Sequence, residues 1–299
     1  MTPGRAAAGL VLVALIWGAS FTVVKETLGA ISPLLLVTIR FGIATLVASP
    51  ALRGLSRREL GAGLVLGALF WGGLAFQTTG LELTTPSRSA FITGLSTPLI
   101  PLVAWLAHRA VPRAAVLVAV ALGAAGLYFL TDPAGGGPNR GDLLTVACAV
   151  LFAGHIVAAG TLSHRGPAMR LLAVQFATTA VLAAVAGPVI ETPRIEWSPA
   201  MAAALLFLSV SAVGTFWYQL RAQRILAPAT TGLIFMLESV FATLTSWLVT
   251  GETLTPGQWA GAALIVAGMA LPLLAPAPAG TQASSDSSSA RTSGTPASR

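Results

Sequence analysis

Residues 86–106 read PSRSAFITGLSTPLIPLVAWL, and residues 228–248 read PATTGLIFMLESVFATLTSWL. The two stretches align without a gap, and they share the identical pairs Pro86/Pro228, Ile92/Ile234, Leu95/Leu237, Leu102/Leu244, Trp105/Trp247 and Leu106/Leu248, each 142 positions apart. Tryptophan and proline account for only 7 and 19 of the 299 residues, so composition alone does not explain their recurrence. The sequence therefore indicates a duplicated unit.

The duplication extends beyond this stretch. At the offset of 142 the chain also repeats Gly72/Gly214, Gln77/Gln219, Leu122/Leu264 and Gly126/Gly268, and at an offset of 135 it repeats Ala14/Ala149 and Phe41/Phe176. We predict one five-helix repeat over residues 6–131 and a second over residues 142–274. Residues 275–299 hold almost no large apolar side chain, and we expect a disordered cytoplasmic tail there.

The composition is that of a membrane protein. Hydrophobic residues make up 55% of the chain and charged residues 9%, with a mean hydropathy of +0.81. Soluble domains carry about 25% charged residues, so this chain has too few to coat a globule. The net charge of +7 does not indicate nucleic-acid binding, because the basic residues are scattered singly between apolar runs. The one cysteine, Cys148, lies in an apolar run and is expected to pack there.

Apolar runs of about 20 residues are long enough to cross a bilayer as helices. The sequence predicts an all-α integral membrane protein with ten such helices, at residues 6–28, 33–52, 60–81, 86–107, 113–131, 142–162, 169–190, 199–220, 227–250 and 256–274.

The basic residues set the expected orientation. With the N-terminus inside, twelve of the seventeen Lys and Arg residues fall on the cytoplasmic side. Lys25, Arg88, Arg140 and Arg194 fall outside, and Arg40 falls within a span. Cytoplasmic loops are enriched in Lys and Arg, so both termini are expected in the cytoplasm, with the protein in the inner or plasma membrane. Because each repeat holds an odd number of spans, the second repeat is expected to be inverted, as in secondary transporters.

Polar residues at bilayer depth indicate where a cavity lies, because a polar side chain in lipid costs free energy. Spans five and ten have wholly apolar middles, so we expect them outside the cavity, braced by small residues. The candidate substrate-binding residues of the other spans are Trp17, Ser20, Gln77, Phe91, Thr93, Ser96, His155, Gln175, Trp217, Tyr218, Gln219 and Glu238. Several are equivalent through the two offsets: Ser20/His155, Gln77/Gln219 and Ser96/Glu238, with Arg40 matching Gln175.

Each of these side chains also has a structural interpretation. The glutamine amides suit hydrogen bonds between helices as well as contact with substrate. His155 is either a packed neutral imidazole or a proton carrier. We expect Arg40 to be a structural charge that pairs with Glu238 or Glu82, or that binds a carbonyl group.

The fourth span carries helix-breaking residues. Gly94, Pro98 and Pro101 lie close together in its middle, and a proline inside a helix removes a backbone hydrogen bond and kinks the helix. In a membrane this is tolerated where the backbone lines a cavity or is buried in protein. We therefore expect a hinge or a broken helix over residues 94–101.

The ordered motifs resemble one known family. They are WGASF at residues 17–21, RF at 40–41, LESV at 237–240, GETL at 251–254 and QWAG at 258–261. In their order along ten spans, the chain resembles EamA-type exporters of the drug/metabolite transporter superfamily. Two positions depart from that pattern. Ser239 replaces a usual proline, which predicts a softer hinge in span nine, and Ala110 stands where Glu252 has its equivalent, which removes a loop contact.

The resemblance implies efflux of small metabolites, and among these we favour amphipathic, amino-acid-like solutes. Whether protons drive the movement, and whether the protein is a monomer or a homodimer, stays open. We expect no cofactor, no metal and no enzymatic activity, since the chain has neither His-Glu-x-x-His nor Gly-x-Ser-x-Gly and its three histidines lie far apart in sequence. A passive channel or facilitator and a lipid-carrier flippase of the same superfamily are the alternatives.

Overall fold

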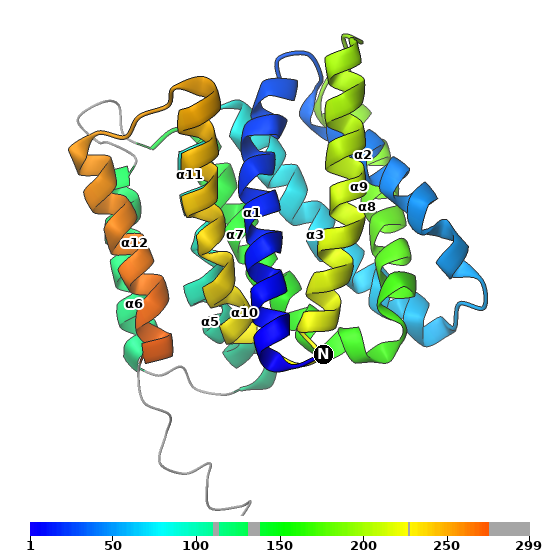
Figure 1. Cartoon of the computed structure of the whole chain (residues 1–299), viewed down its shortest axis with the longest axis horizontal. Coiled ribbons are helices and arrows are strands. Elements are labelled where there is room, and N and C mark those ends of the chain that lie inside the picture. Colours follow the sequence, from blue (N-terminus) through cyan, green and yellow to red (C-terminus); the bar gives the residue numbers. More distant parts are fainter. Residues whose placement is uncertain (110–113, 131–137, 227, 275–299) are drawn as a thin grey trace, which may run out of the picture.

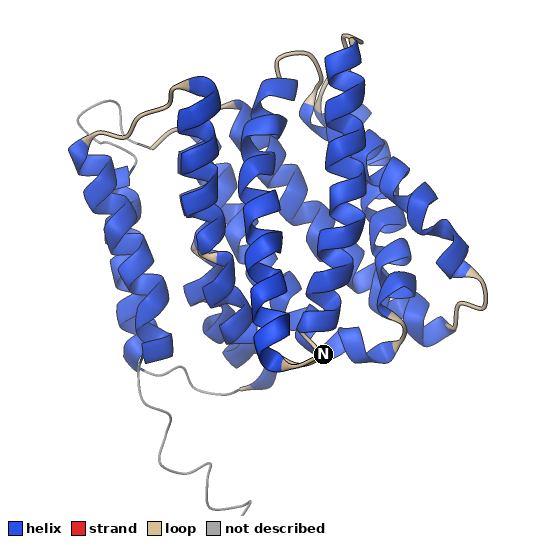
Figure 2. Ribbon diagram, in the orientation of Figure 1, coloured by secondary structure: helices blue, strands red, loops and turns tan. Residues whose placement is uncertain are grey.

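A computed structural model describes residues 1–109, 114–130, 138–226 and 228–274 of the chain. Apart from an isolated bridge between Ile31 and Ile195, the regular structure of these residues is helical (Figures 1 and 2). The α-helices are α1 (Pro3–Thr27), α2 (Pro33–Ala48), α3 (Arg57–Glu82), α4 (Pro86–Gly94), α5 (Ser96–His108), α6 (Ala114–Leu130), α7 (Arg140–Leu162), α8 (Ala168–Ile190), α9 (Pro199–Ala222), α10 (Pro228–Phe235), α11 (Leu237–Thr250) and α12 (Pro256–Leu274). Short 3-10 turns, η1 (Ser49–Leu52) and η3 (Ser163–Arg165), follow α2 and α7.

Local sequence explains where several helices begin. Ser56 and Glu59 form a capping box at the start of α3, and Asn139 and Asp142 form another at the start of α7. Each box satisfies backbone N–H groups that have no partner within the helix. Proline stands in the first turn of α1, α2, α4 and α9, where its missing N–H costs nothing.

Eight segments of the described residues are long and apolar enough to cross a membrane. Six are single helices or a helix with its 3-10 turn, and two, residues 86–107 and 230–250, each run across a helix break. Helix α6 contributes only a shorter apolar stretch, Leu117–Gly126, and α12 is not among the eight. The chain is thus a multi-pass membrane protein, and the count of ten spans stays a prediction. The expected tail, residues 275–299, lies outside the described residues.

The two broken helices break within one residue of equivalent places, since Leu95 corresponds to Leu237 at the offset of 142. The first break lies at Leu95, between α4 and α5, and the second lies at Met236, between α10 and α11. In the first, Pro98 cannot donate the backbone bond to Gly94 that would continue the helix. The break falls within the predicted segment, while Pro101 lies inside the continuous helix α5. The second helix is interrupted even though it lacks the proline.

Helices α1 and α7 run in opposite directions. At the end of α1, the Lys25 ammonium donates to the carbonyl oxygens of Leu81 and Thr84 at 2.9 and 2.8 Å. The hydroxyl of Thr84 donates in turn to the Asp142 carboxylate, at the start of α7, at 2.9 Å. The end of α1 and the start of α7 therefore lie together, at what we call the Lys25 end of the bundle.

The opposite end of the bundle holds the start of α1 and the end of α9. The Tyr218 hydroxyl donates to the carbonyl oxygen of Arg5 at 2.6 Å. Near it, the Gln223 side-chain amide donates to the Ile156 carbonyl of α7 at 3.2 Å. We call this the Arg5 end.

Helices α6 and α12 pack against each other at one edge of the bundle (Figure 1). A Cβ atom added at Gly126 would lie 2.6 Å from the Gly261 carbonyl oxygen, and one added at Gly268 would lie 2.8 Å from that of Ala119. Only glycine allows this close approach of two helix backbones. The pair corresponds to the predicted spans five and ten, which we expected to be braced by small residues.

Candidate functional site

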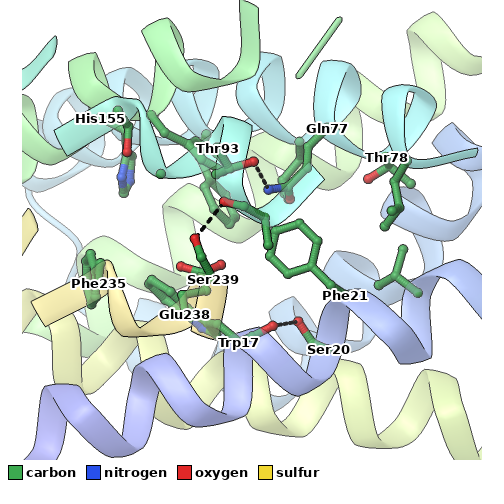
Figure 3. Close-up of a pocket in the computed structure, with 18 of the residues that line it drawn as sticks. Trp17, Ser20, Phe21, Gln77, Thr78, Thr93, His155, Phe235, Glu238 and Ser239 are labelled. Carbon is green, nitrogen blue, oxygen red and sulfur yellow. Dashed lines mark hydrogen bonds between the residues drawn. The ribbon is translucent and has the colours of Figure 1, made fainter. Parts of the chain in front are cut away.

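A cavity of about 90 Å³ lies within the bundle, lined by residues of α1–α5, α7 and α9–α11. In Figure 3, Gln77 and Thr93 lie on the opposite side of the cavity from Trp17 and Glu238. The predicted binding residues that line the cavity are Trp17, Ser20, Gln77, Thr93, Ser96, His155, Gln219 and Glu238. Arg40 and Gly94 line it too, whereas α6 and α12 contribute no lining residue.

Two predicted binding residues are buried beside the cavity rather than in its wall. Phe91 is 3% exposed and packs in an apolar cluster with Met236. Gln175 is fully buried, and its Oε1 lies 3.4 Å from Nε2 of His155. Gln175 therefore contacts a lining residue without reaching the cavity itself, and its Nε2 atom has no hydrogen-bond partner among the described residues.

Two other predicted binding residues face away from the cavity, on another side of α9. Trp217 lies under the Arg221 guanidinium, whose Cζ is 4.9 Å from the ring centroid. Tyr218 reaches the backbone of Arg5. The residues on either side of this pair, Phe216 and Gln219, are the ones that line the cavity. Among the hinge residues, Pro98 and Pro101 do not line it.

The uncharged polar side chains of the wall are only partly satisfied. Gln77 donates to the Thr93 hydroxyl at 3.3 Å, and Ser20 donates to the Trp17 carbonyl at 2.7 Å. Gln219 is 1% exposed, and its Oε1 atom has no hydrogen-bond partner among the described residues. A buried amide oxygen without a partner costs free energy, so it is suited to accept a hydrogen bond from a bound solute.

The cavity wall carries one basic and one acidic side chain among the described residues, Arg40 and Glu238. Arg40 is 9% exposed, its Nε donates to the Leu208 carbonyl at 3.2 Å, and its guanidinium lies 5.1 Å from the Phe41 ring centroid. Of the alternatives expected for Arg40, an ion pair with Glu238 or Glu82 or a bond to a carbonyl group, the carbonyl bond is the one found. Neither Glu238 nor Glu82 forms an ion pair with it within the described residues. The side chain of Glu238 faces the cavity and forms neither a hydrogen bond nor an ion pair with the described residues.

Aromatic rings form the apolar part of the wall. The Trp17 ring lies 4.6 Å from that of Phe216 and 4.9 Å from that of Phe235, and the Phe70 ring lies 4.6 Å from that of Phe216. Sequence reasoning missed Phe70, Phe152, Phe216 and Phe235 as lining residues. One of them, Phe152, could have been predicted from the sequence, because the offset of 135 makes it the equivalent of Trp17.

The wall thus combines a hydrophobic surface with a separate acid, a base and the two amides of Gln77 and Gln219. Such a surface binds a molecule that has an apolar body and polar ends. In the described part of the chain, no three His, Cys, Asp or Glu side chains come close enough to hold a metal ion.

The sequence profile of the EamA-like transporter family matches residues 4–132 and again residues 139–274. An uncharacterized transporter of Archaeoglobus fulgidus is 36% identical over 262 residues, covering 86% of this chain and 82% of its own length. A probable amino-acid metabolite efflux pump of Salmonella typhimurium is 26% identical over 280 residues, covering 86% of this chain and 91% of its own length. A crystal structure whose description names no activity has a similar fold, with a TM-score of 0.66 and 23% identity over 90% of this chain and 97% of that one.

Proposed function

Since this chain belongs to the EamA-like transporter family, we propose that it exports small amphipathic, amino-acid-like solutes from the cytoplasm by alternating access at the cavity described above. One observation carries the proposed solute class. The cavity holds one carboxylate and one guanidinium that are not paired with each other, within a wall of aromatic rings. The Salmonella relative, a probable amino-acid metabolite efflux pump, agrees with this choice.

A zwitterion with an apolar side chain complements this wall. The solute's ammonium group faces Glu238, its carboxylate faces Arg40, and its side chain packs against Trp17 and Phe216. A hydrogen bond to a charged group contributes about 1.5–3 kcal/mol, so both ends of the solute add to its affinity. A sugar phosphate needs several basic groups around it, and the described wall has one.

Alternating access requires two halves that can exchange conformations, and we propose that residues 6–131 and 142–274 are these halves. Helix α1 of the first runs opposite to its equivalent α7 of the second, which supports an inverted repeat. A reciprocal pair of hydrogen bonds supports it further. The Thr97 hydroxyl donates to the Gly232 carbonyl at 3.0 Å, and the Ser239 hydroxyl donates to that of Ala90 at 3.0 Å.

These two hydrogen bonds are equivalent to each other under the repeat. Thr97 is equivalent to Ser239, and Ala90 is equivalent to Gly232, all at the offset of 142. A contact that appears in both directions is what a two-fold axis between the halves produces. The axis then passes between the two broken helices, beside the cavity.

The proposed orientation has both termini in the cytoplasm and the Lys25 end outside. It rests on the excess of basic residues in the loops of the Arg5 side. A reporter fused after Arg299 is expected to register as cytoplasmic in a cell with the protein in its inner or plasma membrane. A periplasmic or extracellular signal would overturn the proposed topology of ten spans with both termini in the cytoplasm.

Counterflow in proteoliposomes tests the transport mechanism and the solute class together. We expect external leucine to accelerate the exit of preloaded radiolabelled leucine, because a carrier returns faster when loaded. The matched competitors are isopentylamine and 4-methylpentanoate, which keep the leucine side chain but each lack one charge, and we expect each to exchange at least tenfold more slowly. Absence of acceleration would contradict a carrier, and equal exchange of either competitor would contradict zwitterion recognition.

A further inference from the structure

In the middle of the cavity, equivalent residues of the two proposed repeats both line the wall. At many positions both equivalents of an offset pair line it, among them Ser20/His155, Gln77/Gln219 and Thr97/Ser239. This part of the wall is common to both repeats, so an exchange of conformations between them leaves it in place.

Beyond the middle, the remaining lining residues lie mostly toward one end, although Phe70 of α3 lies toward the Arg5 end and its equivalent Ala212 does not line the cavity. Four further lining residues lie toward the Lys25 end: Val24, Thr78, Leu81 and Ala90. Their offset equivalents lie toward the Arg5 end and do not line the cavity: Ala159, Leu220, Gln223 and Gly232. All eight residues are buried, so the two sets differ in whether they border the cavity and not in exposure. The cavity is therefore asymmetric along the bundle, because these equivalents at the Arg5 end lie outside its lining.

One of the packed residues is polar where its equivalent is apolar. Gln223 takes the place of Leu81 and is 3% exposed. Its Nε2 donates to the Ile156 carbonyl at 3.2 Å, but its Oε1 has no hydrogen-bond partner among the described residues. A leucine would pack there without that cost, since a buried unsatisfied amide oxygen destabilises the folded state. The amide is explained if a second state of the protein brings water or solute to it.

We propose that Ala159, Leu220, Gln223 and Gly232 line the other half of the solute route, closed in this structure and opened when the two repeats exchange conformations. The proposal rests on the proposed function and adds the residues of the closed half. In the second state the four residues take up the lining positions that Val24, Thr78, Leu81 and Ala90 hold here. The Gln223 oxygen then accepts a hydrogen bond from the solute's ammonium group or from water, as the last polar contact before the Arg5 end.

The proposed exchange of conformations between the repeats leaves the two reciprocal hydrogen bonds in place. Since the Thr97–Gly232 and Ser239–Ala90 bonds are equivalents of each other, exchanging the repeats converts each into the other. Both are therefore kept in the second state, and they form the pivot about which the route opens and closes.

Single-cysteine labelling with a membrane-impermeant thiol reagent tests the closed route. The full-length protein with Cys148→Ala serves as the parent, since Cys148 is its one native cysteine and is not a lining residue. The test variants are Gln223→Cys and Leu81→Cys, and the matched control is Ala222→Cys, which is 0% exposed on the same helix but packs with Leu10. Each variant is labelled in sealed vesicles from either face, with leucine present.

We expect Gln223→Cys to react at least tenfold faster than Ala222→Cys, and from the face opposite to the one that reaches Leu81→Cys. Leu220→Cys, on the same route, replaces Gln223→Cys if that variant does not fold. The proposal would be overturned if Gln223→Cys, or Leu220→Cys in its place, reacts no faster than Ala222→Cys. It would also be overturned if that variant is labelled from the same face as Leu81→Cys. Counterflow by the parent separates the two failures: a parent that exchanges leucine while Gln223→Cys stays unlabelled refutes the route alone, and a parent without counterflow refutes the proposed function.

Discussion

The two broken helices differ in sequence more than in shape. Helices α4 and α5 are separated at Leu95, with Gly94 and Pro98 around the break, whereas α10 and α11 are separated at Met236 without glycine or proline beside it. The second helix is therefore interrupted without the local residues that explain the first break. The reciprocal bonds of Thr97 and Ser239 join the two helices close to both breaks.

The cavity shows the converse, since many equivalent positions of the two halves line it while their side chains differ. Ser96 of the first half corresponds to Glu238 of the second and both line the cavity, whereas Arg40 lines it and its equivalent Gln175 does not. The acid therefore comes from one copy and the base from the other. The wall therefore has unlike ends, which suits a dipolar solute better than a symmetric one.

The largest effect is expected when the acid is removed. Glu238→Ser gives the second copy the residue of the first, and we expect leucine counterflow to fall about tenfold to a hundredfold, since a charged hydrogen bond contributes about 1.5–3 kcal/mol. Adding Ser96→Glu to this variant returns an acid to the equivalent place. If these two positions are equivalent in the cavity, leucine counterflow in proteoliposomes is expected to recover partially in the double variant. No recovery would contradict the equivalence of Ser96 and Glu238. Glu26→Gln, which changes an exposed acid outside this cavity, is the control.

Replacing the base should have a smaller effect. Arg40→Gln installs the residue of the other copy, and we expect the KM for leucine to rise about tenfold, because the carboxylate loses its charged partner at a cost of about 1.4 kcal/mol. The KM for isopentylamine, which has no carboxylate, should not change. A parallel rise for both compounds would assign Arg40 to structure alone. Arg58→Gln, at an exposed position, is the control.

The pH dependence of counterflow should depend on the same acid. Protonation of Glu238 removes the charge that holds the solute's ammonium group, so exchange is expected to weaken as the pH falls. In Glu238→Gln this slope should disappear, while in His155→Gln it should remain. If the pH dependence of counterflow persists in Glu238→Gln, another group is responsible for it. If it is lost in His155→Gln, the imidazole is responsible.

The smallest effect is expected from the two reciprocal bonds. Thr97→Ala and Ser239→Ala each remove one hydroxyl–carbonyl bond, which contributes about 1 kcal/mol, so each should lower the apparent Tm in detergent by a few degrees. Because the bonds are equivalent, we expect similar decreases. Thr243→Ala, whose hydroxyl bonds to the carbonyl of Ser239 in its own helix, is the control. A decrease in only one of the two variants would contradict a shared pivot.

The helices and the break in span four could be predicted from the sequence because they depend on local chemistry. Long apolar runs have to become helices in a membrane, where every backbone polar group needs a partner within its own segment. Pro98 placed the break in span four, and the offsets of 142 and 135 identified Gln77, Gln219, Ser20 and His155 as residues of equivalent depth. All four line the cavity.

The sequence by itself determined the helical membrane architecture, the duplicated pattern and most of the polar wall. Only the tertiary structure decided which face of each helix meets the cavity. In α9, Phe216 and Gln219 line it while Trp217 and Tyr218 point elsewhere, and both faces of that helix are apolar because lipid and protein interior attract the same side chains. It also decided that Arg40 binds the Leu208 carbonyl and that the cavity extends mainly toward the Lys25 end. Those facts depend on contacts between segments far apart in the chain, which no local pattern records.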